Sequence, residues 1–244
     1  MNKIKIFTQN LYGVDFIKKN QRMNEIEEYI YYKKFDFVFL QEAVFISDVK
    51  KIAQNNFSYY VRGRFGPKGG LTIISKKELD KIEFYKFKAQ GAIFSLQITD
   101  RLIEKGFLVG YLGNTVYMNT HLLSTYGRQS GNNVKSLNKQ FEQLFDFVKE
   151  KIKEGKKIIV GGDFNFNPNS KNYKEITKIL NDETIPPKLK IDQEIPPKLK
   201  IKPKYDSEQI DFIFSSKKKC KNYKEPIYPI FVSDHPGIGI ELLS

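Results

Sequence analysis

The stretch KIIVGGDFN at residues 157–165 is an apolar run that ends in an acid and an amide. The same pattern recurs as IKIFTQNLY at 4–12, FDFVFLQE at 35–42 and VYMNTHL at 116–122. Short apolar runs bounded by turn residues are typical of buried strands. Because α/β enzymes gather catalytic groups at strand ends, the pattern predicts an α/β fold with a site at one edge of its sheets.

The chain contains only two histidines, His121 and His235, and each follows an apolar run. Histidine is the side chain that most readily exchanges a proton near neutral pH. A single histidine in such a place is more often a surface or capping residue, but two at matching strand ends predict a catalytic role. Asp211 lies inside the apolar run QIDFIF at 209–214, and a buried carboxylate requires a partner or a metal ion.

Strand-like runs alternate with amphipathic helical segments along the chain. The predicted helices span residues 22–30, 134–152 and 173–180. The further predicted strands span residues 70–75, 84–87 and 92–98, with a hairpin of 107–111 and 115–119 about Gly113-Asn114. Strands both before and after the central helix predict two similar halves, in which two sheets pack face to face with helices outside.

The length of 244 residues favours one domain over residues 1–244, because α/β enzymes commonly have this size. The single cysteine, Cys220, excludes an internal disulfide and a cysteine-based zinc site, and we interpret it as a surface thiol. No apolar run approaches the roughly 20 residues that a membrane span needs. Met1 leads directly into a strand rather than a signal peptide, so we expect a soluble, intracellular protein.

The formal net charge is +13, which suits polyanionic partners such as nucleic acid or an anionic membrane surface. A bias toward A+T-rich codons would also inflate the lysine content without any binding role. The two explanations have equal weight, so the charge alone does not identify a substrate.

One segment is a near-exact tandem repeat: TIPPKLKI at 184–191 recurs as EIPPKLKI at 194–201. Pro-Pro pairs favour an extended backbone and disfavour helix. Two copies do not make a solenoid. We interpret residues 184–201 as a duplicated surface loop rather than a lysine-rich arm that contacts phosphates.

The polar residues at the strand ends comprise four carboxylates, two imidazoles and two amides: Asn10, Glu42, His121, Asp163, Asn165, Asp211, Asp234 and His235. Hard oxygen ligands of this kind suit Mg²⁺, with Mn²⁺ as the alternative. Mg²⁺ usually binds through one or two carboxylates, water and a substrate phosphate, which leaves the other groups for catalysis. The set therefore predicts metal-assisted hydrolysis of a phosphate ester.

Six short motifs occur in a fixed order: Thr8-x-Asn10, LQE at 40–42, NTHL at 119–122, GDFN at 162–165, IDFI at 210–213 and SDH at 233–235. Any one of them is weak alone, but the ordered set resembles the endonuclease/exonuclease/phosphatase superfamily, with its DNase I-like fold. The resemblance covers essentially the whole chain. It implies a four-layered α/β sandwich of two packed mixed β-sheets flanked by helices, which agrees with the architecture argued from the strand pattern.

The resemblance also implies roles. It gives the metal ligands as Glu42, helped by Asn10 and Asp234. It makes Asp163 the group that orients or deprotonates the attacking water. It assigns phosphate contacts to Asn165, His235 and His121, with Asp211 paired to His235.

Within the superfamily, the NTHL motif argues against apurinic-site endonucleases, which lack this histidine. The block at 100–107, GLTIISK at 70–76 and a helix with Gln140 and Gln143 are similar to neutral sphingomyelinases. Residues 120–125, THLLST, are also similar to tyrosyl-DNA phosphodiesterases.

We therefore predict a Mg²⁺-dependent phosphodiester hydrolase with a sphingomyelinase-like active site, acting on a phospholipid or nucleic acid. The alternative is a nuclease or DNA-end-processing phosphodiesterase, which the charge of +13 favours. A binding module with an inactive site is disfavoured, because Glu42, Asp163 and His235 are all present.

Overall fold

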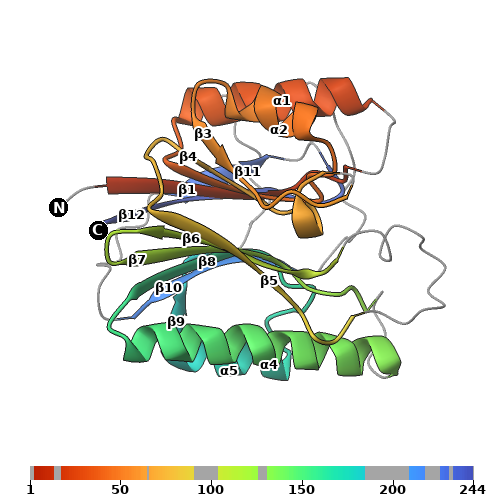
Figure 1. Ribbon diagram of the computed structural model, residues 1–244, viewed down its shortest axis with the longest axis vertical. Coiled ribbons are helices and arrows are strands. Elements are labelled where there is room, and N and C mark those ends of the chain that lie inside the picture. Colours follow the sequence, from red (N-terminus) through yellow and green to blue (C-terminus); the bar gives the residue numbers. More distant parts are fainter. Residues whose placement is uncertain are drawn as a thin grey trace.

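The computed structural model describes residues 3–13, 18–64, 66–90, 104–125, 131–184, 209–217, 226–230 and 233–243. In these residues, two mixed six-stranded sheets pack face to face, and helices cover both outer faces (Figure 1). The four-layered α/β sandwich predicted from the sequence is therefore confirmed.

The first sheet has the strand order β11-β12-β1-β2-β4-β3. Its strands are β1 (Lys3–Asn10), β2 (Phe37–Gln41), β3 (Phe57–Tyr59), β4 (Thr72–Ser75), β11 (Pro226–Ile230) and β12 (Gly237–Leu243). Its outer helices are α1 (Lys19–Lys33) and α2 (Ile46–Ala53), and a short 3₁₀ helix, η1 (Lys68–Gly70), precedes β4. β1 and β2 are parallel, because the chain crosses between them through α1.

The second sheet has the strand order β5-β6-β7-β8-β10-β9. Its strands are β5 (Lys81–Lys86), β6 (Gly106–Leu112), β7 (Thr115–His121), β8 (Lys157–Asp163), β9 (Leu180–Asp182) and β10 (Asp211–Ser216). Its outer helices are α4 (Asn132–Lys153) and α5 (Lys171–Ile179). β7 and β8 are parallel and joined through α4, so each sheet contains one parallel pair with a helical crossover.

Side chains alternate along each strand between an outer cluster under the helices and an inter-sheet cluster. In β8, Ile158 and Val160 belong to the outer cluster of the second sheet, whereas Ile159 belongs to the inter-sheet cluster. In β2, Val38 lies under the helices and Phe39 faces the second sheet. The central strands of each sheet are therefore buried on both faces, as their nearly continuous apolar runs require.

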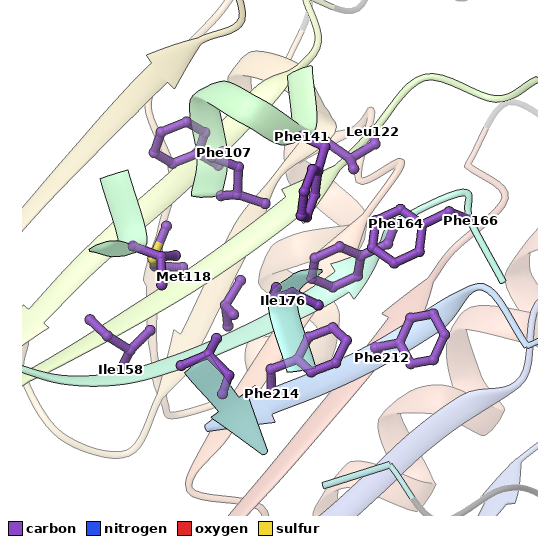
Figure 2. Packing of buried hydrophobic residues seen from close by; sticks show 14 of the residues in the cluster. Phe107, Met118, Leu122, Phe141, Ile158, Phe164, Phe166, Ile176, Phe212 and Phe214 are labelled. Carbon is purple, nitrogen blue, oxygen red and sulfur yellow. The ribbon is translucent and has the colours of Figure 1, made fainter. Parts of the chain in front are cut away.

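The outer cluster of the second sheet contains the apolar stripe of α4, of which Figure 2 labels Phe141. Leu137, Phe141, Leu144 and Val148 are at most 4% exposed, as the spacing of the predicted helix indicated. Substitution of a large apolar side chain in a packed core by alanine lowers the free energy of unfolding by about 2–5 kcal/mol. The stripe holds α4 firmly against β7 and β8, the strands that carry His121 and Asp163 at their ends.

Several boundaries differ from the prediction. β2 begins at Phe37 rather than Phe35, whose ring lies in the outer cluster of the first sheet and stacks on Phe7 with a centroid distance of 4.9 Å. β4 begins at Thr72 and η1 precedes it, and α5 ends at Ile179 with Leu180 already in β9. The hairpin about Gly113-Asn114 is present, with Gly113 at φ 56°, a conformation that favours glycine.

Some predictions fall on other parts of the chain. The strand at 92–98, Cys220 and residues 185–201 of the tandem repeat lie outside the described residues. Thr184, the first residue of the repeat, is only 4% exposed, and its hydroxyl accepts a hydrogen bond from the Ile213 amide at 2.9 Å. Thr184 is thus packed against β10, just after the edge strand β9.

Across the described residues, α4 and the shorter helices are all too polar or too short to serve as a membrane span.

Candidate active site

Three neighbouring strands of the second sheet bring His121, Asp163 and Asp211 into one row. His121 is the register partner of Asp163 between β7 and β8, and Asp211 is the partner of Asp163 between β8 and β10. All three side chains are at most 5% exposed. They share the inter-sheet face with Ile159 and Ile213, because strand alternation places every second residue on that side.

Each member of this row is followed by an apolar residue that points to the opposite face. Leu122, Phe164 and Phe212 are fully buried in the outer cluster, where Figure 2 shows them beside Phe141 and Phe166. Burial of these anchors leaves the preceding side chain facing the other sheet. The sequence pairs His-Leu, Asp-Phe and Asp-Phe thereby set the orientation of the site.

The first sheet supplies the opposing groups from β1, the end of β2 and the turn before β12. Glu42, directly after β2, has a left-handed backbone at φ 52°, a conformation of about 1–3 kcal/mol cost for such a residue. Its carbonyl lies so close to Gly13 that a β-carbon there would come within 2.0 Å of the oxygen. The close approach of residue 13 is thus possible only with glycine.

Asn10 connects the carboxylates of the two sheets. Its side-chain nitrogen donates to Glu42 Oε1 and to Asp163 Oδ2, both at 3.2 Å. Its side-chain oxygen accepts from the Tyr12 amide at 2.9 Å. Since that backbone donor fixes the orientation of the amide, the nitrogen of Asn10 faces the acids and its oxygen faces the loop.

Asp211 and His235 form the pair that the sequence predicted. The Nδ1 atom of His235 lies 2.8 Å from Asp211 Oδ2, and both side chains are buried. Burial alone would favour the neutral imidazole, but the charges of Asp211 and Asp163 outweigh it and raise the pKa of His235 to about 10. His235 is therefore a buried cation at neutral pH.

Hydrogen bonds of Gln9 and Ser233 hold the turn that carries His235. Gln9 Nε2 donates to the His235 carbonyl at 3.1 Å and to Ser233 Oγ at 3.2 Å. Ser233 Oγ also accepts from the His235 amide at 3.0 Å. This turn belongs to the first sheet while Asp211 belongs to the second, so the His235–Asp211 pair spans the sandwich.

Asp163 is the central carboxylate of the site. Its Oδ2 lies 3.4 Å from His121 Nε2 and 3.9 Å from His235 Nε2, in addition to the bond from Asn10. Its Oδ1 accepts from the Asn165 amide at 3.0 Å. Burial raises the pKa of Asp163 to about 7, against the lowering effect of the neighbouring His235 cation.

His121 is a neutral imidazole next to a buried lysine. Burial lowers its pKa well below the usual range, and the adjacent Lys105 lowers it further. Lys105 Nζ lies 2.8 Å from His121 Nε2. Because an ammonium group can only donate, Nε2 accepts and the proton of His121 resides on Nδ1.

Asn165 follows Asp163 in a left-handed conformation at φ 51°, which asparagine tolerates well. Its side-chain nitrogen donates to the Leu122 carbonyl at 2.9 Å. Asn165 thereby links the loop after β8 to the residue that follows His121.

The structure thus brings seven of the eight predicted residues into one connected group: Asn10, Glu42, His121, Asp163, Asn165, Asp211 and His235. Asp234, the eighth, is adjacent to His235 and raises the pKa of Glu42 by its charge.

The donor set fits a divalent cation at Glu42. Burial raises the pKa of Glu42, and Lys105 and the hydrogen bond from Asn10 lower it. Asp234 adds a second negative charge that disfavours ionised Glu42. A hard cation between these two carboxylates would relieve both effects.

A second grouping of ligand types also occurs among the described residues. Atoms of Asp163, Asp211 and His235 lie within 4.8 Å of one another, a spacing compatible with a metal ion. The 2.8 Å hydrogen bond between Asp211 and His235 accounts for this proximity without a metal.

Lys105 is a site residue that the sequence did not reveal. It is 3% exposed, and its ammonium group acts on His121, Asp163 and Glu42. The chain has 41 lysines and arginines, and composition alone does not distinguish Lys105 from the solvated ones. The available signals were its place in the block at 100–107, which is similar to neutral sphingomyelinases, and its position directly before Gly106 at the start of β6.

Among curated proteins, the chain matches the "Inositol phosphosphingolipids phospholipase C" of Schizosaccharomyces pombe, with 24% identity over 193 residues. The match covers 74% of this chain and 46% of the relative, so the chain spans about half the length of that protein.

Solved structures with a similar fold include the sphingomyelinase C of Streptomyces griseocarneus, with a TM-score of 0.67, 16% identity and 100% coverage of both chains. A beta toxin of Staphylococcus aureus with bound magnesium ions has a TM-score of 0.68, 21% identity and 100% coverage of both. The D. rerio TDP2 complexed with a single-strand DNA product has a TM-score of 0.68, 18% identity and 100% coverage of both. Identities this low show a shared fold.

The sequence profile of the Endonuclease/Exonuclease/phosphatase family matches residues 7–235. That range contains every predicted site residue from Asn10 to His235. The chain therefore belongs to the endonuclease/exonuclease/phosphatase family of hydrolases.

Proposed function

We propose that this protein hydrolyses phosphodiester bonds in a Mg²⁺-dependent reaction, with a phospholipid of the phosphosphingolipid class as its substrate. The observation that carries the proposal is the convergence of Asn10, His121 and His235 on one buried carboxylate, Asp163. Such a cluster joins a base of near-neutral pKa to groups that contact a phosphate.

Glu42 is the principal metal ligand in this proposal, and Asp234 supplies a second oxygen. Asn10 adjoins the metal position and holds the Glu42 carboxylate through its amide. Mg²⁺ bound there would neutralise charge on the phosphate and on the leaving oxygen. Mn²⁺ has the same preference for oxygen ligands and is the alternative.

Asp163 orients the attacking water and accepts its proton. A general base works best when its pKa is near the working pH, and the pKa of Asp163 is about 7. The bonds from Asn10 and the Asn165 amide occupy one direction of each oxygen and thereby fix the plane of the carboxylate.

The phosphate is held by donors on the far side of Asp163. The His235 cation binds a phosphate oxygen through its Nε2 proton, while Asp211 holds the opposite nitrogen and the ring orientation. The ammonium group of Lys105, which donates to Nε2 of His121 and is held in place by it, supplies a second donor. Asn165 binds a further phosphate oxygen. These donors become more valuable as negative charge develops in the transition state.

The choice of a phospholipid rests on the named activity of the S. pombe relative, which aligns with 74% of this chain. The sphingomyelinase C structure shares the fold over the full length of both chains. The motifs at 70–76 and 100–107 support the same branch of the family.

A nucleic acid substrate is the second candidate, and the net charge of +13 favours it. Phosphate contacts by lysine and arginine supply most non-specific affinity for nucleic acid. The TDP2 structure with its single-strand DNA product has the same fold as this chain.

A substrate panel with Mg²⁺ tests the proposal and separates the two candidates. The panel contains vesicles with sphingomyelin or inositol phosphosphingolipid, 5′-tyrosyl single-strand DNA, plasmid DNA and bis-p-nitrophenyl phosphate. We expect Mg²⁺-dependent release of the phosphorylated headgroup from the lipid vesicles. The Asp163→Asn variant is the matched control and should be inactive. Cleavage of DNA with intact lipid would establish the second candidate, and turnover after full chelation would refute the metal dependence.

A further inference from the structure

The two sheets meet through a polar contact just below the active site. The side-chain nitrogen of Asn119 in β7 donates to the carbonyls of Leu40 at 2.8 Å and Thr72 at 2.9 Å. Its oxygen accepts from Gln41 Nε2 at 2.7 Å. Asn119 belongs to the second sheet and its three partners to the first. We call these four residues the inter-sheet tie.

The inter-sheet tie lies at the border between the apolar interior and the active site. Asn119 precedes His121 by two residues on the same face of β7, a separation of roughly 7 Å along the strand. Gln41 directly precedes Glu42. On the other side of the tie, the inter-sheet cluster begins with Phe39 and Tyr117. The tie is therefore adjacent to site residues of both sheets.

The tie is fully buried, and Asn119 donates both of its amide protons within it. Asn119, Leu40, Gln41 and Thr72 are all 0% exposed. Both protons of the Asn119 amide and one oxygen lone pair are used by partners in the opposite sheet. Hydrogen bonds are stronger and more costly to break in such surroundings than in water.

The candidate active site is divided between the two sheets. Asn10, Glu42 and the turn with Asp234 and His235 come from the first sheet, and the His121, Asp163 and Asp211 row comes from the second. Apolar contact between sheets is not directional, so it alone would let one sheet slide over the other. Hydrogen bonds from one side chain to two strands of the opposite sheet remove that freedom.

We propose that Asn119 is a positioning residue that fixes the metal-binding half of the site relative to the half that binds phosphate. This proposal rests on the proposed function. Asn119 itself touches no reacting atom; it acts through the separation of Glu42 and Asp163, and through the His235–Asp211 pair that crosses the same gap.

The test compares Asn119→Leu, which keeps the size but removes all three bonds, with Ile240→Ala. Ile240 lies in the inter-sheet cluster on β12, which β1 separates from β2, and its apolar side chain makes no hydrogen bond, so its truncation lowers stability by packing alone. Asn119→Asp serves as a second variant, because its carboxylate cannot donate to the two carbonyls. All proteins are assayed at a temperature at which circular dichroism shows them folded.

We expect kcat for bis-p-nitrophenyl phosphate to fall about a hundredfold in both Asn119 variants, the scale for a misplacement of about 1 Å. The Mn²⁺ concentration for half-saturation, followed by the electron spin resonance of free Mn²⁺, should rise about tenfold. Ile240→Ala should lose thermal stability but keep both values. Wild-type values in a folded Asn119→Leu protein would overturn the proposal.

A readout that needs no activity separates this proposal from the proposed function. With only two histidines in the chain, the Nδ1 proton that His235 shares with Asp211 gives an identifiable downfield NMR signal. We expect the Asn119 variants to lose or shift this signal and Ile240→Ala to retain it. If the wild-type protein neither binds Mn²⁺ nor hydrolyses a phosphodiester, the proposed function fails. The NMR signal then tests the role of Asn119 by itself. An unchanged signal position in the Asn119 variants would refute that role.

Discussion

Two neighbours determine the orientation and the charge of each site residue: the next residue in sequence and the partner in space. The apolar residue that follows His121, Asp163 or Asp211 buries into the outer cluster and turns the polar side chain toward the first sheet. The partner in space then sets its charge. Asp163 and Asp211 are both buried acids, but Asp211 is directly paired with His235 and Asp163 is shared by several groups.

The Asp211–His235 pair should act as one unit in catalysis. We expect His235→Ala to lower kcat by at least about a hundredfold, the scale for one lost transition-state donor. Asp211→Asn should have a smaller effect of the same kind, because it weakens the cation and leaves the ring less well held. The double variant should be little worse than His235→Ala alone. Measured kcat values whose logarithmic losses simply add would mean that the two residues function independently.

The pH dependence of the rate should report Asp163. A base with a pKa of about 7 is protonated below that value, so kcat/KM should fall about tenfold for each pH unit below about 7. The residual rate of Asp163→Asn should show no such acidic limb, whereas Asp182→Asn, at the border of β9, should keep it. A limb that survives in Asp163→Asn would assign the titration to another group.

At the scale of elements, the spacing of the sheets depends on a glycine in β8. A β-carbon on Gly161 would lie 2.7 Å from Cδ2 of Phe39 on the facing strand β2. Gly161 shares the inter-sheet face with Asp163 and is the register partner of Asn119. The close approach of β8 to β2 therefore requires a residue without a side chain at this position.

Gly161→Ala should destabilise the protein by about 1–3 kcal/mol, because the added methyl group overpacks the core. Phe39→Leu in the same chain should restore part of the loss, since the smaller side chain makes room for the methyl group. Urea unfolding of both single variants and the double variant measures the coupling. Equal destabilisation by Gly161→Ala in the two backgrounds would show that Phe39 is not the obstacle.

At the scale of the whole molecule, metal binding and folding should be linked. A ligand that binds only the folded state stabilises it, by about 2.7 kcal/mol at about 100 times its Kd. We expect Mg²⁺ to raise the Tm of the wild-type protein. Glu42→Gln keeps the shape of the side chain but removes its charge. We expect a clear increase in the Mg²⁺ concentration needed for half-maximal activity, and only a small decrease in the Tm measured without metal. The same Mg²⁺-dependent increase in both proteins would place the ligand elsewhere.

The buried His235 cation should also make stability depend on pH. Its folded-state pKa of about 10 is above the usual value of 6.5, so the folded state holds the proton more tightly than the unfolded chain. The resulting stabilisation is complete below pH 6.5 and is lost as the pH rises through about 10. The free energy of unfolding, measured with chelator, should fall across this window, and His235→Gln should flatten the curve. Parallel curves for the two proteins would contradict a raised pKa.

The sequence by itself determined the layered architecture and the residues that could form the site. Alternation along 157–165 and similar stretches specifies strands with both faces buried, and apolar stripes specify the helices that cover them. These patterns are readable because each depends on residues close together in the chain. The order of the motifs added the family, which the profile match over residues 7–235 confirms.

Only the tertiary structure decided how those residues meet. Asn10 and Asp163 are 153 positions apart, and their contact depends on the register of both sheets. The burial of Lys105, the inter-sheet bonds of Asn119 and the raised pKa of Asp163 likewise arise from segments distant in sequence. Local pattern records which face a side chain takes, whereas charge state and hydrogen-bond partner are collective properties of everything packed around it.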